Sequence, residues 1–234
     1  MDFKIIPTGD AAITLHFGSK IEKITNDRIQ AFSSLLLQQN YQWLIEVVPA
    51  YTTTTIYYDP TKLIDHGEAP FSYIRKTLQQ LASQKHEESI TDARTVEIPV
   101  CYGGDYGPDL DYVATHNNLS REEVIERHIA GDYHVYMLGF SPGFPYIGGL
   151  NETIATPRKT TPATRITEGS VGIAGNQTGI YPNESPGGWQ IIGRTPLKLF
   201  RTQQEPPTLL QAGDQIRFRE ISEQEFKTLK EDER

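Results

Sequence analysis

The first third of the chain alternates between short β-like segments and longer segments with a helical apolar period. The short segments, one of them with four threonines that favour extended backbone, predict four strands, at 3–10, 12–17, 43–50 and 52–58. Apolar residues three and four positions apart predict two amphipathic helices, at 24–40 and 69–84. The order strand, strand, helix, strand, strand, helix predicts an α+β unit in which helices cover one face of a sheet.

A polar segment follows this unit. Residues 83–95 are charged and hydrophilic and show no apolar period, which is typical of a linker between domains. We therefore place a domain boundary between residues 88 and 89. The sequence predicts an α+β domain at 1–88 and a second domain at 89–234.

Two short helices are predicted near the start of the second domain. We expect Pro108 just inside the first turn of the earlier one, where a backbone N–H has no helical partner anyway. The later helix has the capping-box spacing of Ser120 and Glu123. Gly131 stands at its end, where a left-handed residue is often found.

Most of the second domain is predicted to consist of short strands and turns. Gly, Pro and Asn separate apolar segments at 95–102, 133–138, 170–175, 178–182, 188–195, 197–200 and 214–221. This pattern is typical of a closed or sandwiched antiparallel sheet. A final helix with a capping pattern is expected at 222–234.

The segment 137–150, MLGFSPGFPYIGGL, places aromatic residues among two prolines and four glycines. It is too broken for a helix or an uninterrupted strand. We expect a stiff aromatic loop that leaves the strand at 133–138 and either lines a pocket or faces another protein.

The composition narrows the class of protein. The net charge is −8 and no cluster of Lys and Arg offsets it, which argues against a nucleic-acid partner. The chain does not open with a secretory signal, and no apolar run approaches the roughly 20 residues that span a bilayer. We therefore expect a cytoplasmic protein without a membrane partner. Its single cysteine, Cys101, excludes an internal disulfide and is expected in a strand core.

Several common catalytic motifs are missing from the sequence. It has neither a P-loop nor a nucleophile elbow, and no cysteine–histidine spacing suits zinc. The six histidines are scattered, so we predict no metal site. The spacing of Gly169, Gly172 and Gly175 is more typical of tight sheet corners than of a phosphate-binding loop.

Arginines on stiff backbone are the first candidates for a site. Arg158 and Arg165 lie in the proline-containing segment TPRKTTPATR, where little entropy is lost when a guanidinium is held in place. They suit bidentate capture of a carboxylate or phosphate, or they form surface salt bridges. Trp189 and Arg194 follow in YPNESPGGWQIIGRTP, where the tryptophan is either a core residue or a pocket wall.

His128 is a separate candidate. It follows Val124 by four residues, on a partly apolar face and in the last turn of a predicted helix. A histidine there is either packed and stabilised by the helix dipole or acts as an acid or base.

Four segments of the chain resemble the signature blocks of a known family. They are IPVCYGGDYGPDLDYVA, YMLGFSPGFPYIGGL, TPRKTTPATR and GSVGIAGNQTGIYPNESPGGWQIIGRTP. Together they are similar to the PxpB/KipI family, also called allophanate hydrolase subunit one or the carboxyltransferase C/D domain family. The likeness is strong over about residues 95–200, and the N-terminal pattern fits the same family.

The resemblance implies a fold and several functions. The fold would be an α+β N-terminal domain followed by a mainly-β cyclophilin-like barrel, with no implication of prolyl isomerase activity. The function would be that of the PxpB subunit in an ATP-dependent 5-oxoprolinase complex, which converts 5-oxo-L-proline to L-glutamate together with PxpC/KipA-like and PxpA/LamB-like subunits. Alternatives are a KipI-type inhibitor of a sporulation histidine kinase and a subunit of an allophanate or urea-amidolyase-like hydrolase. ATP is implied for the complex, with no location on this chain.

For this activity we predict a set of site residues. The catalytic candidates are His128, as an accessory acid or base, and Arg158 and Arg165, as positive charges for a carboxylate or phosphoryl group. The predicted substrate-binding residues are Phe140, Phe144, Tyr146, Gln177, Trp189 and Arg194. The block at 161–170 departs from the expected family pattern, because one arginine and one proline are missing. Arg165 is therefore left alone there.

Overall fold

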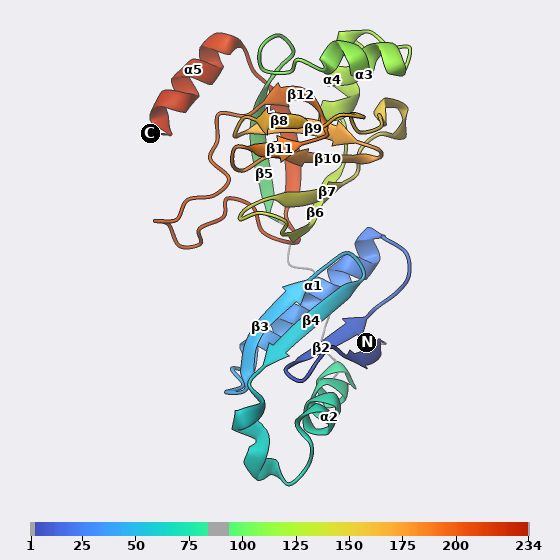
Figure 1. The fold of residues 1–234 in the computed structure, drawn as a ribbon, viewed down its shortest axis with the longest axis vertical. Coiled ribbons are helices and arrows are strands. Elements are labelled where there is room, and N and C mark those ends of the chain that lie inside the picture. Colours follow the sequence, from blue (N-terminus) through green and yellow to red (C-terminus); the bar gives the residue numbers. More distant parts are fainter. Residues whose placement is uncertain (1–2, 84–93, 234) are drawn as a thin grey trace. The chain divides into compact units, whose positions relative to one another are not determined.

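The structure is a computed structural model that describes residues 3–83 and 94–233 (Figure 1). The chain divides into two compact units, Met1–Asp92 and Ala93–Arg234, and each is described by itself. The predicted boundary between residues 88 and 89 lies outside the described residues.

The N-terminal unit has the predicted order of strands and helices, with one short 3-10 helix added. Its elements are β1 (Lys4–Pro7), β2 (Ala12–His16), α1 (Lys23–Gln38), β3 (Leu44–Pro49), β4 (Thr53–Tyr58), η1 (Pro60–His66) and α2 (Pro70–Ser83). The four strands form an antiparallel sheet in the order β1-β2-β4-β3.

A single core joins this sheet to both helices. In β4, Thr54, Ile56 and Tyr58 are buried while the residues between them are more exposed, as a two-residue period requires. The buried apolar side chains of the helices recur every three or four residues: Ile29, Phe32 and Leu36 in α1, and Ile74, Leu78 and Leu81 in α2. The pattern of the sequence therefore decides which face each element buries.

The C-terminal unit is built around a closed barrel. Its elements are β5 (Thr95–Tyr102), α3 (Leu110–His116), α4 (Arg121–Ile129), β6 (Tyr133–Leu138), β7 (Pro145–Gly148), η2 (Glu152–Ile154), β8 (Ala163–Ile166), β9 (Ser170–Ala174), β10 (Gln177–Ile180), β11 (Ser185–Gly187), β12 (Gln190–Arg194), β13 (Gln215–Glu220) and α5 (Glu223–Asp232). Seven strands close in the order β10-β7-β6-β13-β5-β12-β9. The prediction of a closed sheet is confirmed.

One strand pair of the barrel differs from the predicted antiparallel arrangement. β5 and β13 run parallel, with Ile98 opposite Phe218. These strands come from the first and last parts of the unit, and the whole chain between them serves as the connection. A parallel pair needs such a long connection, which a local sequence pattern does not reveal.

Aliphatic side chains fill the barrel. Neighbouring strands contribute Val171, Ile173, Ile180, Ile192 and Phe218 to one core. The helices α3 and α4 add Leu110, Val113 and Val124 to the same core. The helices therefore cover the barrel as part of its hydrophobic core.

Two expectations about the helix ends are wrong and one is confirmed. Pro108 is not in the first turn of α3, because Asp109 is the N-cap and the proline precedes it. Gly131 does not have a left-handed backbone. It is needed because a side chain there would overlap the ring of Tyr133, whose hydroxyl donates a hydrogen bond of 2.7 Å to the carbonyl of His128. The capping box of Ser120 at the start of α4 is confirmed.

The strand predictions also need correction. Residues 197–200 form a loop, in which Leu199 is fully buried because it packs on the barrel core rather than because it alternates within a strand. The segment 137–150 is not all loop, since Pro145–Gly148 forms β7 and pairs with β6. The strands β8 and β11 form a small two-stranded sheet that the sequence did not indicate.

Candidate functional site

A second layer of buried side chains lies against the barrel, and we call it the outer cluster. It consists of Phe144, Ile166, Ala174, Tyr181, Trp189 and Ile191. In β9 and β12, Ala174 and Ile191 are next to Ile173 and Ile192 of the barrel core, and successive residues of a strand point to opposite faces. The outer cluster therefore faces away from the barrel axis. Ile166 of β8 belongs to the cluster, which places the β8–β11 sheet against the outside of the barrel.

Glycines allow Trp189 to lie directly on the barrel strands. A Cβ at Gly172 would come within 3.2 Å of the Cβ of Trp189, and a Cβ at Gly179 would come within 2.9 Å of its ring. Gly169 and Gly175 have left-handed backbones, with φ of +82° and +60°. The spacing of three glycines in the sequence thus combines two turn positions with one position of close packing.

Arg158 lies over this tryptophan at the surface. Its guanidinium carbon is 5.9 Å from the centre of the Trp189 ring. The side chain is exposed, and no carboxylate pairs with it among the described residues. The next residue, Lys159, is by contrast neutralised by Asp109 at 2.6 Å. Arg158 therefore presents a full positive charge beside an aromatic surface.

Tyr181 stands beneath this charge. Burial raises the pKa of its hydroxyl, while a hydrogen bond with the backbone of Trp189 and the charge of Arg158 oppose the rise. Tyr181 was not among the predicted site residues. Its position between Gln177 and Trp189, two predicted site residues, was only a weak indication of a role in the site. The chain has twelve tyrosines, so one more near these residues is not distinctive.

The aromatic residues of the segment 137–150 have two different environments. Phe144 is 4% exposed and meets Trp189 and Tyr181 edge to face, with ring centres 5.9 and 5.7 Å apart. Tyr146 packs against Phe144 at the border of the outer cluster. Phe140 is 75% exposed and has a φ of +71°. It borders a shallow depression of about 390 Å³ along Leu138–Gly143. Phe144 and Trp189 are thus packed residues, and Phe140 is the accessible one.

Two predicted site residues lie at the border of the outer cluster. Arg165 of β8 pairs with Glu184 at 2.7 Å, and both side chains are largely exposed. Its charge is therefore matched by a carboxylate. Gln177 is the half-buried first residue of β10, where it pairs with Ala174.

His128 is fully buried in the barrel, away from the outer cluster. Its Nδ1 lies 2.8 Å from the hydroxyl of Tyr102 and its Nε2 lies 3.0 Å from the hydroxyl of Thr178. Thr178 donates its own proton to the carbonyl of Gly172 at 3.0 Å, so Nε2 of His128 carries a hydrogen and Nδ1 accepts one from Tyr102. Both ring nitrogens are occupied.

Burial also decides the charge of this histidine. It lowers the pKa of His128 from 6.5 to about 3, so the ring is neutral at physiological pH. A neutral, fully buried ring with both nitrogens hydrogen-bonded cannot exchange a proton with a substrate. We therefore correct the predicted acid–base role and treat His128 as a structural residue.

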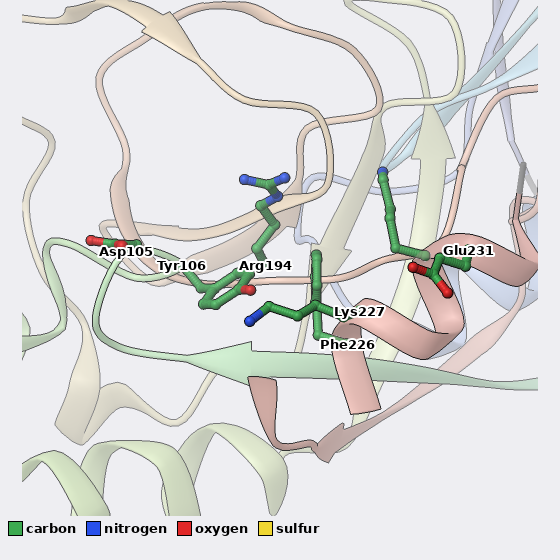
Figure 2. A pocket seen from close by; sticks show the side chains of 7 residues that line it. Asp105, Tyr106, Arg194, Phe226, Lys227 and Glu231 are labelled. Carbon is green, nitrogen blue, oxygen red and sulfur yellow. The ribbon is translucent and has the colours of Figure 1, made fainter. Parts of the chain in front are cut away.

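Arg194 contacts a different pair of aromatic rings. Its guanidinium carbon lies 5.8 Å from the ring centre of Tyr106 and 5.5 Å from that of Phe226. The three residues line an open pocket of about 340 Å³ together with Asp105, Lys227, Lys230 and Glu231 (Figure 2). The sequence did not indicate the residues of α5, because a charged amphipathic C-terminal helix usually only faces solvent.

The described residues hold no group of three or more His, Cys, Asp or Glu side chains placed to bind a metal ion. Within the same part of the chain, no helix has the length and apolar character needed to cross a membrane.

Known proteins resemble almost the whole chain. The family described as carboxyltransferase domain, subdomain C and D, matches residues 3–210. The B subunit of 5-oxoprolinase from Bacillus subtilis (strain 168) is 46% identical over 234 residues, covering 98% of this chain and 98% of that protein. The protein of the same name from Haemophilus influenzae is 40% identical over 216 residues, covering 92% of this chain and 96% of that protein.

Longer proteins contain a region similar to this chain. The crystal structure of TTHA0988 superposes with a TM-score of 0.77 and 36% identity over 90% of this chain, which spans only 40% of that protein. Urea amidolyase of Saccharomyces cerevisiae is 33% identical over 135 residues, covering 53% of this chain and 7% of that protein.

Proposed function

We propose that this chain is the PxpB subunit of an ATP-dependent 5-oxoprolinase. The premise is that the chain belongs to the PxpB/KipI family of carboxyltransferase subdomains C and D. The observation that carries the proposal is the 46% identity to a 5-oxoprolinase B subunit over 98% of both chains. The reaction would convert 5-oxo-L-proline to L-glutamate in the cytoplasm. The barrel would be of the cyclophilin-like type.

The chemistry of this reaction calls for positive charge. The lactam of 5-oxoproline is an unactivated amide, and phosphorylation of its oxygen by ATP would activate the ring carbon. ADP would leave in that transfer. Water would then add to the carbon, and the C–N bond would break as the nitrogen takes up a proton, which leaves γ-glutamyl phosphate. A second water would hydrolyse this acyl phosphate to glutamate and phosphate. The substrate carboxylate and the transferred phosphoryl group are both negative, and a fixed guanidinium stabilises either of them.

Arg158 is the arginine that best fits this role. It has no carboxylate partner among the described residues, whereas Arg165 is paired with Glu184. The ring of Trp189 holds its guanidinium without reducing its charge, and the ring itself is fixed by the outer cluster. ATP would be used by the complex as a whole, and the catalytic groups would be shared with the partner subunits.

The partners would be a PxpC/KipA-like and a PxpA/LamB-like subunit. The similarity to a chain of which this protein spans only 40% supports a function beside further protein regions. Phe140 would contribute to such a contact, since it is an exposed aromatic side chain at the border of the outer cluster.

The proposal is tested by reconstitution. The purified chain is combined with the two partner subunits, and the ATP-dependent loss of 5-oxoproline and formation of glutamate are measured. Turnover is expected only when all subunits are present. Three wild-type subunits that copurify but show no ATP-dependent turnover would contradict the proposed function.

Variants of the complex test the role of Arg158. Arg158→Ala is expected to lower kcat/KM by about tenfold or more, which corresponds to about 1.4 kcal/mol of transition-state stabilisation. Arg217→Ala is the matched control. Arg217 is exposed on β13 of the same unit, and its substitution removes the same positive charge. Equal activity of the two variants would refute the assignment of Arg158.

A second candidate function is a subunit of an allophanate or urea-amidolyase-like hydrolase. The 33% identity to a urea amidolyase over 53% of this chain favours it. The same reconstituted complex, assayed with urea and allophanate in place of 5-oxoproline, distinguishes the two functions. Inhibition of a sporulation histidine kinase by this chain alone would instead support a KipI-type role.

A further inference from the structure

The pocket around Arg194 is formed by parts of the chain that lie far apart in the sequence. Asp105 and Tyr106 come from the loop after β5, and Arg194 comes from the end of β12. The opposite side is formed by α5 (Figure 2). Its volume of about 340 Å³ lies at the lower end of the range for small-molecule sites.

Arg194 is held in this pocket without a counter-ion. Tyr106 and Phe226, whose ring centres are 4.6 Å apart, both lie within 6 Å of its guanidinium carbon. Among the described residues no carboxylate forms an ion pair with it, and its buried Nε has no hydrogen-bond partner. Buried polar groups normally have a partner, and a guanidinium is matched best by a planar or tetrahedral oxyanion.

Two lysines of α5 add positive charge to the same pocket. Lys227 and Lys230 are three residues apart and therefore project from one side of the helix. They stand next to Phe226, which is buried against Cys101 and Ile221 and fixes the helix on the barrel.

The lining as a whole is cationic. It has three positive side chains and two negative ones, Asp105 and Glu231, although the chain as a whole has a net charge of −8. Outside the lining, Glu223 lies 4.0 Å from Lys227, in an exposed pair that binds weakly. A local excess of positive charge in an acidic protein favours an anion in the pocket over a cation.

We propose that this pocket binds a phosphate-bearing small anion. Arg194 would receive two oxygens through its fork of N–H donors, and the two lysines would neutralise the remaining charge. A phosphate uses three cationic groups better than a single carboxylate does, because it has more acceptor oxygens. Anion binding in this pocket would not depend on the proposed 5-oxoprolinase function, because all the residues that line the pocket belong to this chain.

Calorimetric titration of the full chain with inorganic phosphate and, separately, with ATP tests the proposal. The two arms distinguish free phosphate from a phosphate ester as the preferred ligand. The variant Lys227→Ala, Lys230→Ala removes one exposed and one half-buried cation and leaves Phe226 in place. The matched control is Lys23→Ala, Lys76→Ala, which removes the same charge from exposed residues of α1 and α2. Thermal unfolding verifies that both variants fold.

The expected result is saturable binding of at least one ligand by the wild-type chain and by the control, with affinity about tenfold lower in the α5 variant. Affinity should also fall as the salt concentration rises. The proposal is overturned if neither ligand binds saturably to the wild-type chain. It is equally overturned if both double variants lose the same affinity, because binding would then follow net charge and not this pocket.

Discussion

Replacing Gly179 by alanine tests whether direct contact with the barrel holds Trp189 in place. Gly179 is in β10 and points toward the outer cluster. A Cβ there would lie 2.9 Å from Cζ3 of Trp189, 3.1 Å from its Cη2 and 3.4 Å from Cζ of Phe144. Both rings are buried, at 7% and 4% exposure, so neither can move freely into solvent. The added methyl group must displace the outer cluster or the strand.

The size of the effect follows from two opposing contributions. Inserting a methyl group into a packed core costs about 1–3 kcal/mol. Alanine is favoured over glycine within a strand by about 0.5–1 kcal/mol. The backbone at Gly179 is not left-handed, so no further strain is expected. Taking the middle of each range, we expect Gly179→Ala to lower the free energy of unfolding by about 1 kcal/mol.

Urea denaturation followed by far-UV circular dichroism measures this change. The comparison includes Trp189→Phe and the double variant, because the smaller ring removes the closest contact with the new methyl group. The cost of Gly179→Ala should then shrink, which gives a coupling energy of at least about 0.5 kcal/mol in the double-mutant cycle. A Gly179→Ala protein as stable as the wild type, or a coupling energy of zero, would refute the packing argument.

Gly175→Ala is the control for backbone strain. Gly175 has a φ of +60°, and a Cβ there would have nothing within 4 Å. The substitution should cost about 1 kcal/mol through its left-handed backbone. This cost should be the same with tryptophan or phenylalanine at position 189, which separates strain from packing.

Two further predictions concern His128 and Phe140. Because burial lowers the pKa of His128 from 6.5 to about 3, the unfolded chain takes up this proton more readily, and stability is lost as the pH falls between those values. From pH 6.5 to 5 the free energy of unfolding should fall by about 1.5 kcal/mol, as measured by urea denaturation. The variant His128→Gln should lose less stability over this pH range. Parallel pH profiles of the variant and the wild type would exclude a contribution of His128. Phe140→Ala should weaken assembly with the partner subunits by about tenfold, as measured by calorimetry, and change the unfolding free energy by less than about 0.5 kcal/mol, because the ring is 75% exposed. Unchanged assembly would remove Phe140 from the contact.

The parts of the fold that the sequence predicted are those governed by local patterns. The helical period around Phe32 and Leu78 decides which helix faces are buried, and it is visible in single segments. The strand β4 was predictable from its threonines, whereas its alternation of burial is seen only in the structure. The capping box of Ser120 is likewise contained in four residues. The density of short strands predicted a closed or a sandwiched sheet, and only the family resemblance favoured the closed barrel.

The errors arise where distant residues decide the structure. Gly131 is required by the ring of Tyr133, and Leu199 is buried because a loop packs on the barrel core. The parallel pairing of β5 with β13 joins the two ends of the unit. No local pattern contains these contacts. The glycine at 131 was therefore interpreted as a turn residue, and the apolar residues at 197–200 as a strand.

The predicted site shows the same division. His128 was placed correctly on a helix face, but its partners Tyr102 and Thr178 come from β5 and β10, and they decide that it is structural. Of the predicted aromatic residues, Phe144 contacts Trp189, while Phe140 and Tyr146 contact Phe144. The burial of Phe144 and Trp189 was not visible, because Gly172 and Gly179 look like turn residues in the sequence and serve as a flat surface for the indole ring.

The three arginines of the predicted site differ in the groups that hold their side chains. This difference decides which of them has a charge left to bind an anion. Arg165 is held by a carboxylate, which cancels its charge. Arg158 and Arg194 are held by aromatic rings, which supply roughly 0.5–2 kcal/mol of attraction and leave the charge uncancelled. An arginine that is fixed in position and lacks a counter-ion attracts an anion from outside the chain. The outer cluster and the α5 pocket are therefore two separate places where the described residues leave an arginine without a counter-ion.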